Sequence, residues 1–282
     1  DGIHVYVLYP KGKVSPIQEC QFTTLGRNIT AIEVDGNFDD CQRLVKSAFL
    51  DEELNAKMLL TSANSINVAR FLPQAFYYFS GYAQLKAKGR TEEIVVCVPS
   101  GNFGNITAGL IAHRMGLPIK RFIAANNAND IFYNYLQTGK YNPKASIQTL
   151  ANAMDVGDPS NFARVLDLYY GKHAVIASFI SGTTFSDAEI ADAMRKCYEQ
   201  TGYVLDPHGA CGYLALKHLI QQGETGLFLE TAHPAKFLDT VAGIIGKEIA
   251  IPERLQEFMK GEKKSVAMTS EFADFKNYLM SE

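Results

Sequence analysis

The sequence predicts an α/β fold. Short apolar runs rich in β-branched residues alternate with stretches of helical length, which is typical of strands and helices stacked in layers. Residues 93–125 contain, in order, a strand, a polar loop, a helix, a turn and a second strand. Such a unit pairs its two strands in parallel and crosses over with a right hand. At 282 residues, the chain has room for about two domains.

The first part of the chain is predicted to be a small piece of α/β sheet. A run of β-branched and aromatic residues ends at a Pro-Lys-Gly turn, as expected of a buried strand. A later helix has Asp39 or Asp40 in position to cap its first turn. The other expected elements are strands over 3–9 and 28–34 and a helix over 15–25.

The pattern then restarts, so residues 1–57 and 58–282 are predicted to be separate domains. In the second domain, Ser186 and Glu189 form a capping box that opens a helix. The stretch 126–160 is rich in Asn and weakly periodic, and short helices and loops are expected there. The remaining expected elements are helices over 68–88, 106–115 and 208–220, strands over 93–98, 121–125 and 226–230, and a final helical region.

Composition and charge argue against several classes of protein. Hydrophobic residues make up 47% of the chain and charged residues 20%, which is a globular balance. The formal net charge of −3 argues against a broad basic face for nucleic acid. No apolar run approaches the ~18 residues that cross a bilayer, and the first residues lack the features of a secretory signal. A cytoplasmic protein without a nucleic-acid or membrane partner is therefore expected.

The five cysteines are scattered and are expected to be reduced thiols packed as small apolar side chains. None forms a Cys-x-x-Cys pair, and none has zinc-finger spacing to a histidine. No metal site is predicted. No Ser-His-Asp order or paired-carboxylate spacing stands out either, so the residues themselves indicate an α/β protein with one or two anion sites.

A loop rich in glycine and asparagine follows the strand over 93–98 and precedes a helix. Its two glycines permit a tight turn, and the free N–H groups at the helix start carry the positive end of the helix dipole. Such a loop can bind a phosphate, but Gly and Asn are also common in ordinary turns. Neither the Walker pattern nor the dinucleotide fingerprint is present. The candidate contacts are Gly101, Asn102, Phe103, Gly104 and Asn105.

A second candidate anion site lies at the start of the helix over 68–88. Asn64, Ser65 and Arg70 gather amide, hydroxyl and guanidinium groups there, which are good partners for an anion. An ordinary helix cap with a solvated arginine is the alternative.

Two histidines are candidate bases. His233 follows the strand over 226–230, at the carboxyl end where open α/β sheets place their sites. His208 lies in an Asp-Pro-His-Gly segment at the start of a helix. For both, a purely hydrogen-bonded role is the alternative.

Five separated segments together resemble the threonine synthases, a family of pyridoxal-phosphate-dependent lyases. They occur in the order of the family and run over nearly the whole chain. The segments are Leu-Tyr-Pro-Lys-Gly-Lys-Val-Ser-Pro over 8–16, Asn-Ser-Ile-Asn over 64–67, Pro-Ser-Gly-Asn-Phe-Gly over 99–104, Asn-Ala-Met-Asp-Val over 152–156 and Thr-Ala-His-Pro-Ala-Lys-Phe over 231–237.

The resemblance implies the fold-type II architecture of tryptophan-synthase-β-like enzymes. In that architecture, parallel or mixed sheets flanked by helices form two α/β domains, and pyridoxal 5′-phosphate lies in the cleft between them. The implied reaction converts O-phospho-L-homoserine and water to L-threonine and phosphate, with the cofactor as electron sink.

The resemblance also implies roles for particular residues. The loop from Gly101 to Asn105 would hold the cofactor phosphate through backbone N–H groups. Thr231 would contact the pyridine nitrogen and, being a hydroxyl rather than a carboxylate, keep it largely uncharged. Asn64, Ser65 and Arg70 resemble the pocket for the substrate phosphate. Lys236 is a further candidate partner for an anion.

One departure from the family changes these expectations. The family carries a further N-terminal region with the Schiff-base lysine, and no lysine here has a comparable context, so no catalytic residue is assigned. Residues 1–57 are expected to be the remnant of an incomplete small domain, and 58–282 the large cofactor-binding domain. The isolated chain is expected to be inactive and to self-associate through surface that the absent region covers. The alternatives are a non-catalytic paralogue that binds a phosphorylated metabolite and another fold-type II lyase.

Overall fold

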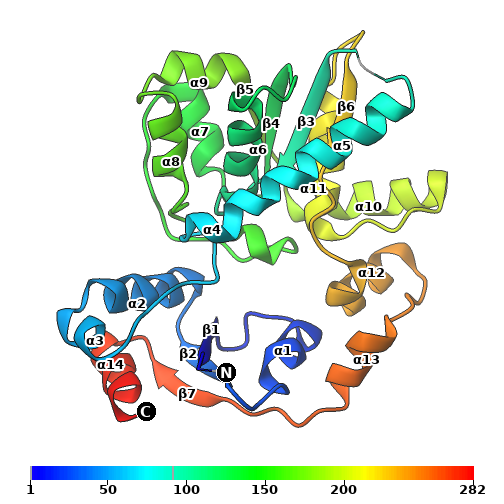
Figure 1. The fold of residues 1–282 in the computed structure, drawn as a ribbon. Helices are drawn as coiled ribbons and strands as arrows, with labels where there is room; N and C mark the ends of the chain where they lie inside the picture. The colour runs from blue at the N-terminus through cyan, green and yellow to red at the C-terminus, as the bar shows by residue number, and fades with distance from the viewer. Residues whose placement is uncertain (1, 91) are drawn as a thin grey trace. The chain divides into compact units, whose positions relative to one another are not determined.

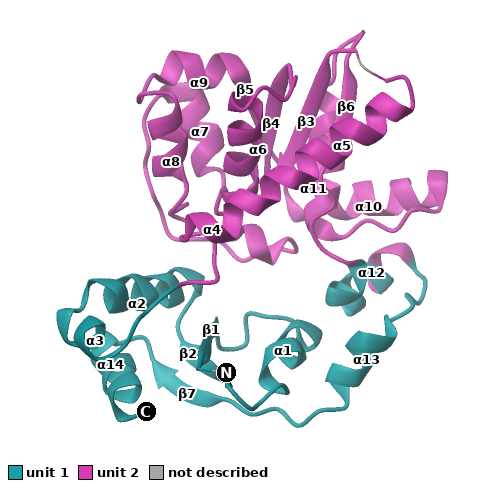
Figure 2. Ribbon diagram, viewed as in Figure 1, with its two compact units in different colours: residues 1–61, 234–242, 246–282 teal, residues 62–233, 243–245 magenta. Residues whose placement is uncertain are grey.

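Two parallel sheets, each with its own helices, organise the chain in the computed structural model, which describes residues 2–90 and 92–282 (Figure 1). Unit 1 holds the chain up to Thr61 and again over Pro234–Ala242 and Gly246–Glu282. Unit 2 holds Ser62–His233 and Gly243–Ile245 (Figure 2). The predicted α/β fold class is confirmed in both units.

Unit 1 is built on a three-stranded parallel sheet in the order β1-β2-β7. The elements of the chain before Thr61 and after His233 are β1 (Val5–Pro10), α1 (Pro16–Thr23), β2 (Ile29–Asp35), α2 (Phe38–Leu50), α3 (Glu52–Lys57), η3 (Pro234–Phe237), α12 (Leu238–Ile245), α13 (Glu253–Met259), β7 (Val266–Thr269) and α14 (Phe272–Ser281). Ile32 of β2, Leu44 of α2 and Phe275 of α14 pack together in one buried cluster. The core of unit 1 therefore joins the two ends of the sequence.

The compact units differ from the predicted domain boundaries in the C-terminal part of the chain. β7 pairs in parallel with β2, with Val266 opposite Ile32, so the predicted second domain, 58–282, does not form one compact unit. β7 has only four residues, alternately half-buried and exposed, and so short a pattern does not predict a strand. The predicted first boundary at residue 57 lies near Thr61.

Unit 2 is built on a four-stranded parallel sheet in the order β5-β4-β3-β6. Its strands are β3 (Ile94–Pro99), β4 (Arg121–Asn126), β5 (Ile180–Thr184) and β6 (Thr225–Phe228). The predicted β-α-β unit is present as β3, α6 (Gly104–Arg114) and β4. The strand β5 was not predicted, because Ile180 is followed only by Ser, Gly and Thr residues. The carboxyl ends of the four strands meet at one edge of the sheet.

Helices cover both faces of this sheet. Besides α6, the helices of unit 2 are α4 (Val68–Phe71), η1 (Leu72–Gln74), α5 (Ala75–Ala87), α7 (Ile131–Thr138), η2 (Asn152–Met154), α8 (Phe162–Leu168), α9 (His173–Phe179), α10 (Asp187–Thr201) and α11 (Pro207–Leu219). α5 and α6 lie on one face and α11 on the other (Figure 1). The single helix predicted over 68–88 is instead α4, η1 and α5, because Pro73 lacks the N–H that a continuous helix needs.

Helix starts follow capping rules that the sequence indicates only in part. Ser186 and Glu189 form the predicted capping box of α10. The expectation for α2 was wrong, because Asn37 rather than Asp39 or Asp40 is its N-cap. Asp40 instead accepts a hydrogen bond from the N–H of Asn37, which completes an Asn-x-x-Asp capping box.

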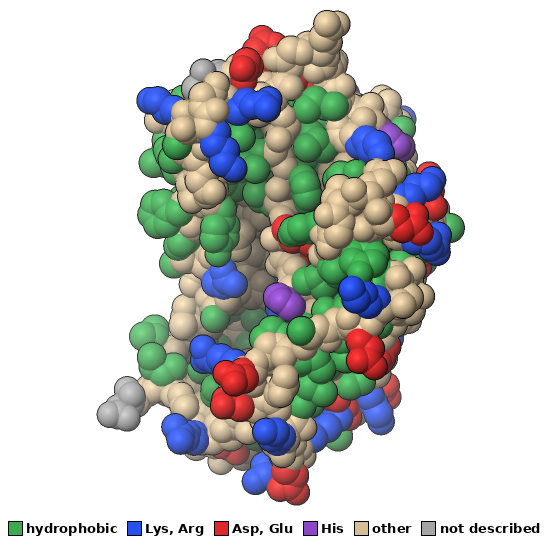
Figure 3. Space-filling model, turned by 90° about the vertical axis from the view of Figure 1, so that its right-hand side faces the viewer, with side chains coloured by type: hydrophobic (Ala, Val, Ile, Leu, Met, Phe, Trp, Pro, Cys, Tyr) green, Lys and Arg blue, Asp and Glu red, His purple; other side chains and the backbone are tan. Residues whose placement is uncertain are grey.

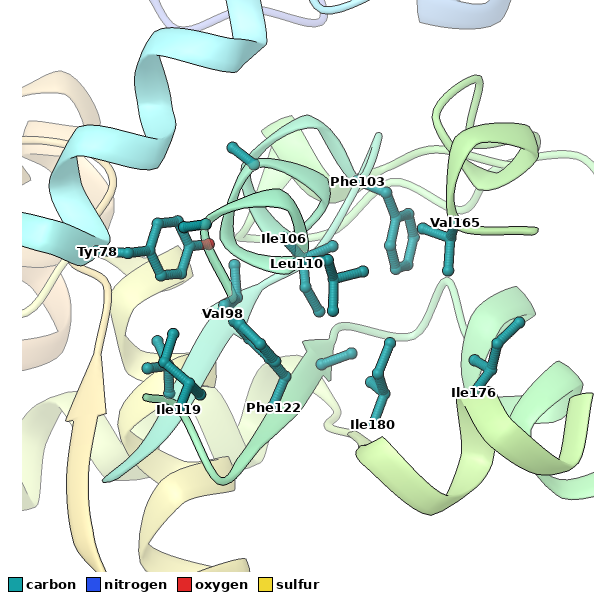
Figure 4. Close-up of a cluster of buried hydrophobic side chains, with 14 of the residues drawn as sticks. Tyr78, Val98, Phe103, Ile106, Leu110, Ile119, Phe122, Val165, Ile176 and Ile180 are labelled. Atoms are coloured by element: carbon teal, nitrogen blue, oxygen red, sulfur yellow. The ribbon is translucent and has the colours of Figure 1, made fainter. Parts of the chain in front are cut away.

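The main core of unit 2 lies between its sheet and the pair α5–α6. Figure 4 shows Tyr78 of α5, Leu110 of α6 and Phe122 of β4 in this cluster. A side chain at Gly109 would put its Cβ 2.4 Å from the Tyr78 ring, so the two helices can approach only at a glycine. Phe103, in the loop after β3, is 1% exposed and joins the same core. The core therefore anchors the loop whose residues are predicted to bind phosphate.

The surface mixes charges of both signs. On the face drawn in Figure 3, Lys and Arg side chains alternate with Asp and Glu side chains among hydrophobic ones. None of the helices in the described part of the chain is both long and apolar enough to cross a membrane. Several large apolar side chains are exposed on α4, η1 and α5, namely Val68, Leu72, Phe76 and Tyr77.

Candidate functional site

The loop between β3 and α6 has an unusual backbone at Phe103. This residue has φ 65° and ψ 11°, a left-handed conformation that side-chain-bearing residues seldom adopt, and it is the N-cap of α6. Its ring is buried 4.6 Å from the ring of Phe132, and its carbonyl accepts from the N–H and the hydroxyl of Thr107 at 3.0 and 2.6 Å. Core packing and these bonds hold the strained residue in place.

The N–H groups of this loop point to no acceptor in the described part of the chain. Within residues 2–90 and 92–282, no hydrogen bond is made by the backbone N–H groups from Gly101 to Asn105. The carbonyls are used instead: Asn126 donates to the Ser100 carbonyl and Asn161 to the Asn102 carbonyl, both at 2.8 Å. Successive open N–H groups at the start of an eleven-residue helix form a cradle for an anion. The loop therefore fits a phosphate group.

Both glycines of the loop are required by close packing behind it. A Cβ at Gly101 would lie 2.7 Å from the Cα of Met154 and 2.8 Å from the carbonyl oxygen of Ala153. A Cβ at Gly104 would lie 2.8 Å from the Cβ of Ser65. The turn at 153–154 and the turn at 65 therefore form the wall against which the loop rests.

Asn102 connects the loop to the second predicted anion site. Its Nδ2 donates to Ser65 Oγ at 2.8 Å, and its Oδ1 accepts from the N–H and hydroxyl of Ser160 at 2.8 and 3.0 Å. Asn64 lies beside Ser65 and accepts from its N–H at 2.7 Å. The structure thus brings Asn64 and Ser65 to the loop of Asn102, which is 37 residues after Ser65 in the chain.

Arg164 holds the Ser65 turn and was not predicted. Its guanidinium donates to the carbonyls of Ser65 and Ile66 at 3.1 and 2.6 Å, and it lies over the Phe71 ring, 4.8 Å from its centre. The fork of a guanidinium suits two neighbouring carbonyls. Because Arg164 is about a hundred residues from its partners, nothing in its own sequence neighbourhood indicates this role.

Arg70 and Thr231 are exposed. Arg70 lies on α4, just after the Ser65 turn, and its side chain makes no hydrogen bond or ion pair within the described residues. Thr231 follows β6, which pairs with β3, and the N–H of Leu229 donates to the carbonyl of Cys97 at 3.1 Å. Thr231 and the glycine loop therefore follow neighbouring strands at the same edge of the sheet.

A buried acid, Asp206, and a half-buried acid, Glu230, lie at the start of α11. Asp206 is its N-cap and accepts from the His208 N–H at 2.8 Å and from His208 Nδ1 at 2.6 Å. The N–H of Asp206 donates to Glu230 Oε1 at 2.9 Å. Burial would raise the pKa of Asp206, but its hydrogen bonds with His208 outweigh burial and lower that pKa. Burial raises the pKa of the Glu230 carboxyl to about 8, and the charge of Asp206 adds to the rise.

Asp155 closes a polar cluster at the end of β4. Its carboxylate accepts from Asn127 Nδ2 at 2.8 Å, from Asn129 Nδ2 at 3.1 Å, and from the N–H and hydroxyl of Thr149 at 2.9 and 2.7 Å. Burial raises the pKa of Asp155 to about 6, against the opposing effect of these donors. Two asparagines of the stretch that the sequence indicated to be irregular, Asn127 and Asn129, are therefore side-chain donors to a single acid.

The remaining candidates lie apart from these contacts. His233 is exposed at the end of unit 2. Lys236 belongs to η3 in unit 1, where its carbonyl accepts from Ser15 Oγ at 2.6 Å. Among the described residues, no cluster of His, Cys, Asp or Glu could hold a metal ion, and the cysteines are free thiols.

Comparisons with known proteins agree with this geometry. Residues 2–227 match the family model described as pyridoxal-phosphate dependent enzyme, and residues 209–279 match the model described as threonine synthase, C-terminal. The chain is 47% identical to the threonine synthase of Haemophilus influenzae over 99% of its own length and 65% of that protein. It is 45% identical to the threonine synthase of Escherichia coli over 99% of the chain and 65% of that protein.

Solved structures give the same result. The crystal structure of threonine synthase from Escherichia coli matches 99% of this chain and 64% of its own, with a TM-score of 0.93 and 45% identity. A threonine synthase from Brucella melitensis with bound pyridoxal phosphate matches with a TM-score of 0.86 and 35% identity, over 100% of this chain and 66% of its own. A serine racemase from Dictyostelium discoideum, 14% identical with a TM-score of 0.56, shares the fold alone.

The chain spans about two thirds of the length of the curated relatives that it matches. The resemblance found in five short segments is confirmed over nearly all of these 282 residues, and the predicted fold-type II architecture is confirmed with it. The chain belongs to the family of pyridoxal-phosphate-dependent enzymes.

Proposed function

We propose that the chain supplies the cofactor-phosphate site and the substrate-phosphate site of a threonine synthase, which converts O-phospho-L-homoserine and water to L-threonine and phosphate. The observation that carries this proposal is the pairing of an open N–H cradle with a second polar turn. Asn102 belongs to the cradle and donates to Ser65 in the turn at 2.8 Å. A substrate that carries its own phosphate needs a second anion site close to the first.

The cradle from Gly101 to Asn105 would hold the phosphate of pyridoxal phosphate through its N–H groups. When bound, the cofactor supplies an electron sink for the charge left when a proton leaves a substrate carbon. Thr231 would place a hydroxyl toward the pyridine nitrogen, and a neutral hydroxyl leaves that nitrogen largely uncharged. No lysine of this chain is assigned to a covalent bond with the cofactor, so we expect the isolated chain to bind it without catalysis.

Asn64, Ser65 and Arg70 would bind the phosphate of the substrate. The Ser65 turn is held by Arg164, whose guanidinium donates to the backbone carbonyls of Ser65 and Ile66 and not to the side chains at 64 and 65. Arg70 is exposed and carries the positive charge that a phosphate dianion requires. The alternative of another fold-type II lyase would need a different pattern at these residues, whereas a phosphometabolite-binding paralogue would share the phosphate sites and lack the reaction.

A binding experiment tests this function. Titration with 4-deoxypyridoxine 5′-phosphate avoids random reaction with lysines, because that ligand lacks the aldehyde of the cofactor. We expect one site per chain, competition by inorganic phosphate, and an affinity at least about tenfold lower in Gly101→Ala because its Cβ meets Ala153 and Met154. Gly243→Ala is the control, since a Cβ there meets nothing within 4 Å. Absence of binding to the unmodified chain would contradict the proposal.

Self-association is proposed for the same chain. Phe76 and Tyr77 of α5 are 71% and 67% exposed, and Val68 and Leu72 are exposed on the preceding segments. Exposed apolar side chains on these consecutive helical segments favour contact with another apolar surface. Sedimentation velocity should show concentration-dependent association that Phe76→Ser weakens, and a monomer at every concentration would contradict this. The cytoplasmic location stays a prediction.

A further inference from the structure

The histidine at the start of α11 has both ring nitrogens engaged inside the protein. His208 is 3% exposed, its Nδ1 donates to Asp206 Oδ1 at 2.6 Å, and its Nε2 accepts from the N–H of Ala153 at 3.1 Å. An acceptor at Nε2 fixes the proton on Nδ1. The ring therefore bridges a buried carboxylate and a backbone N–H, and because both of its nitrogens are engaged its geometry does not suit the base that the sequence suggested.

The far end of this bridge lies directly behind the phosphate cradle. Ala153 belongs to η2, and its carbonyl oxygen and the Cα of Met154 would meet a Cβ at Gly101 at 2.8 and 2.7 Å. Backbone atoms so close leave no room for the two segments to move independently. The position of Ala153 therefore sets the position of Gly101, and His208 sets the position of Ala153.

The other end of the bridge, Asp206, is connected to Thr231, the second predicted cofactor contact. Asp206 donates its N–H to Glu230 Oε1 at 2.9 Å, and Glu230 directly precedes Thr231. A Cβ at Gly209 would lie 1.8 Å from Glu230 Oε2, so the carboxyl rests on the first turn of α11. One helix start thus braces both the cradle and the chain that leads to Thr231.

We propose that His208, oriented by Asp206, is a positioning residue that holds the Ala153 turn and thereby keeps the N–H groups from Gly101 to Asn105 in the geometry that grips the cofactor phosphate. This rests on the proposed function of the cradle and adds a residue that makes no contact with the cofactor phosphate itself. His208 acts through Ala153, and its effect falls on phosphate affinity.

Two substitutions separate the two ends of the bridge. In His208→Gln, the amide oxygen reaches the place of Nε2 and can still accept from Ala153. In His208→Asn, the shorter amide reaches the place of Nδ1 and can still donate to Asp206, but the Ala153 N–H loses its acceptor. Each variant keeps one of the two hydrogen bonds, so we expect both to lose similar amounts of thermal stability.

The test measures the affinity of the full chain for 4-deoxypyridoxine 5′-phosphate and for inorganic phosphate, together with the melting temperature. We expect His208→Asn to weaken the binding of both ligands about tenfold and His208→Gln to stay within about threefold of the unmodified chain, because only His208→Asn leaves the Ala153 N–H without an acceptor. His173→Asn is the control: His173 is on α9, and its Nε2 contacts the carbonyl of Leu136, on α7, at 3.0 Å. It should lower stability without changing affinity.

Each outcome decides the question. Equal affinity losses in His208→Asn and His208→Gln, or no loss in either, would overturn the inference while leaving the proposed function intact. If the unmodified chain binds neither ligand, the proposed function fails and the inference fails with it. If His208→Asn does not fold, ¹⁵N-histidine spectra of the unmodified chain replace it: titration with inorganic phosphate should shift the His208 ring nitrogens and leave those of His173 unchanged, and unshifted His208 signals would overturn the inference.

Discussion

Two loops at the same edge of the unit 2 sheet have similar compositions but use their polar groups in opposite ways. The loop after β3 leaves the N–H groups from Gly101 to Asn105 without acceptors among the described residues. In the segment after β4, Asn127 and Asn129 donate to the carboxylate of Asp155. An abundance of asparagine therefore does not distinguish a binding loop from a structural one. The difference is whether an acceptor from elsewhere in the chain satisfies the donors.

The largest effect, on the free energy of unfolding, is expected when Asp155→Asn disrupts the hydrogen bonds in the segment after β4. Both oxygens of this carboxylate accept hydrogen bonds, four in all. In an asparagine one oxygen is replaced by an NH₂ group, which would face these donors and could not accept from them. We expect a loss of about 2–4 kcal/mol in the free energy of unfolding, because a buried network is left with unpaired donors. Urea denaturation measures it.

Asp158→Asn is the matched control for this change. Asp158 is exposed and accepts from the Tyr141 hydroxyl at 2.7 Å, and an asparagine oxygen can accept the same bond. We expect its effect to stay below about 0.5 kcal/mol. Equal effects of the two substitutions would show that the cluster around Asp155 is not a closed network.

The next effect is expected from adding charge to the open loop with Asn102→Asp. A carboxylate can still accept from Ser160, and the hydroxyl of Ser65 can turn to donate to it, so stability should change by less than about 1 kcal/mol. The added charge lies beside the open N–H groups, and affinity for inorganic phosphate should fall about tenfold. Gln84→Glu, on the exposed face of α5, adds the same charge elsewhere. Equal losses in both variants would place the phosphate away from this loop.

The two loops also show what the sequence could and could not predict. The cradle was predictable because its glycines, its asparagines and the helix behind it are neighbours in the chain. Asp155 and Ser160 were not predicted as partners of these loops, nor Arg164 as the partner of the Ser65 turn. The hydrogen bonds in question join residues that are 26 to 99 positions apart. The same reason applies to β7, a four-residue strand that exists only because β2 lies beside it. The local sequence pattern predicts where a loop lies, but whether its donors are satisfied depends on residues distant in the sequence.

The last effect concerns Glu230, whose carboxyl has a hydrogen-bond partner at only one of its two oxygens among the described residues. Its Oε1 accepts from Asp206, and its buried Oε2 has no partner among the described residues. Burial raises its pKa to about 8 from an ordinary value of 4.5, so ionisation costs more in the folded chain than in the unfolded one. Its contribution to stability is full below pH 4.5 and is lost as the pH rises through 8.

Glu230→Gln removes this loss, because the amide is neutral at every pH and keeps an oxygen for the Asp206 N–H. The unfolding free energy of the variant minus that of the unmodified chain should rise by about 1–2 kcal/mol between pH 5 and pH 8.5, a value reduced for the partial exposure of the side chain. The titration of Asp155 is common to both proteins and cancels in the difference. Parallel pH curves would mean that Glu230 is already charged at neutral pH. The end of β6 would then resemble the loop after β4, where donors satisfy an ionised acid.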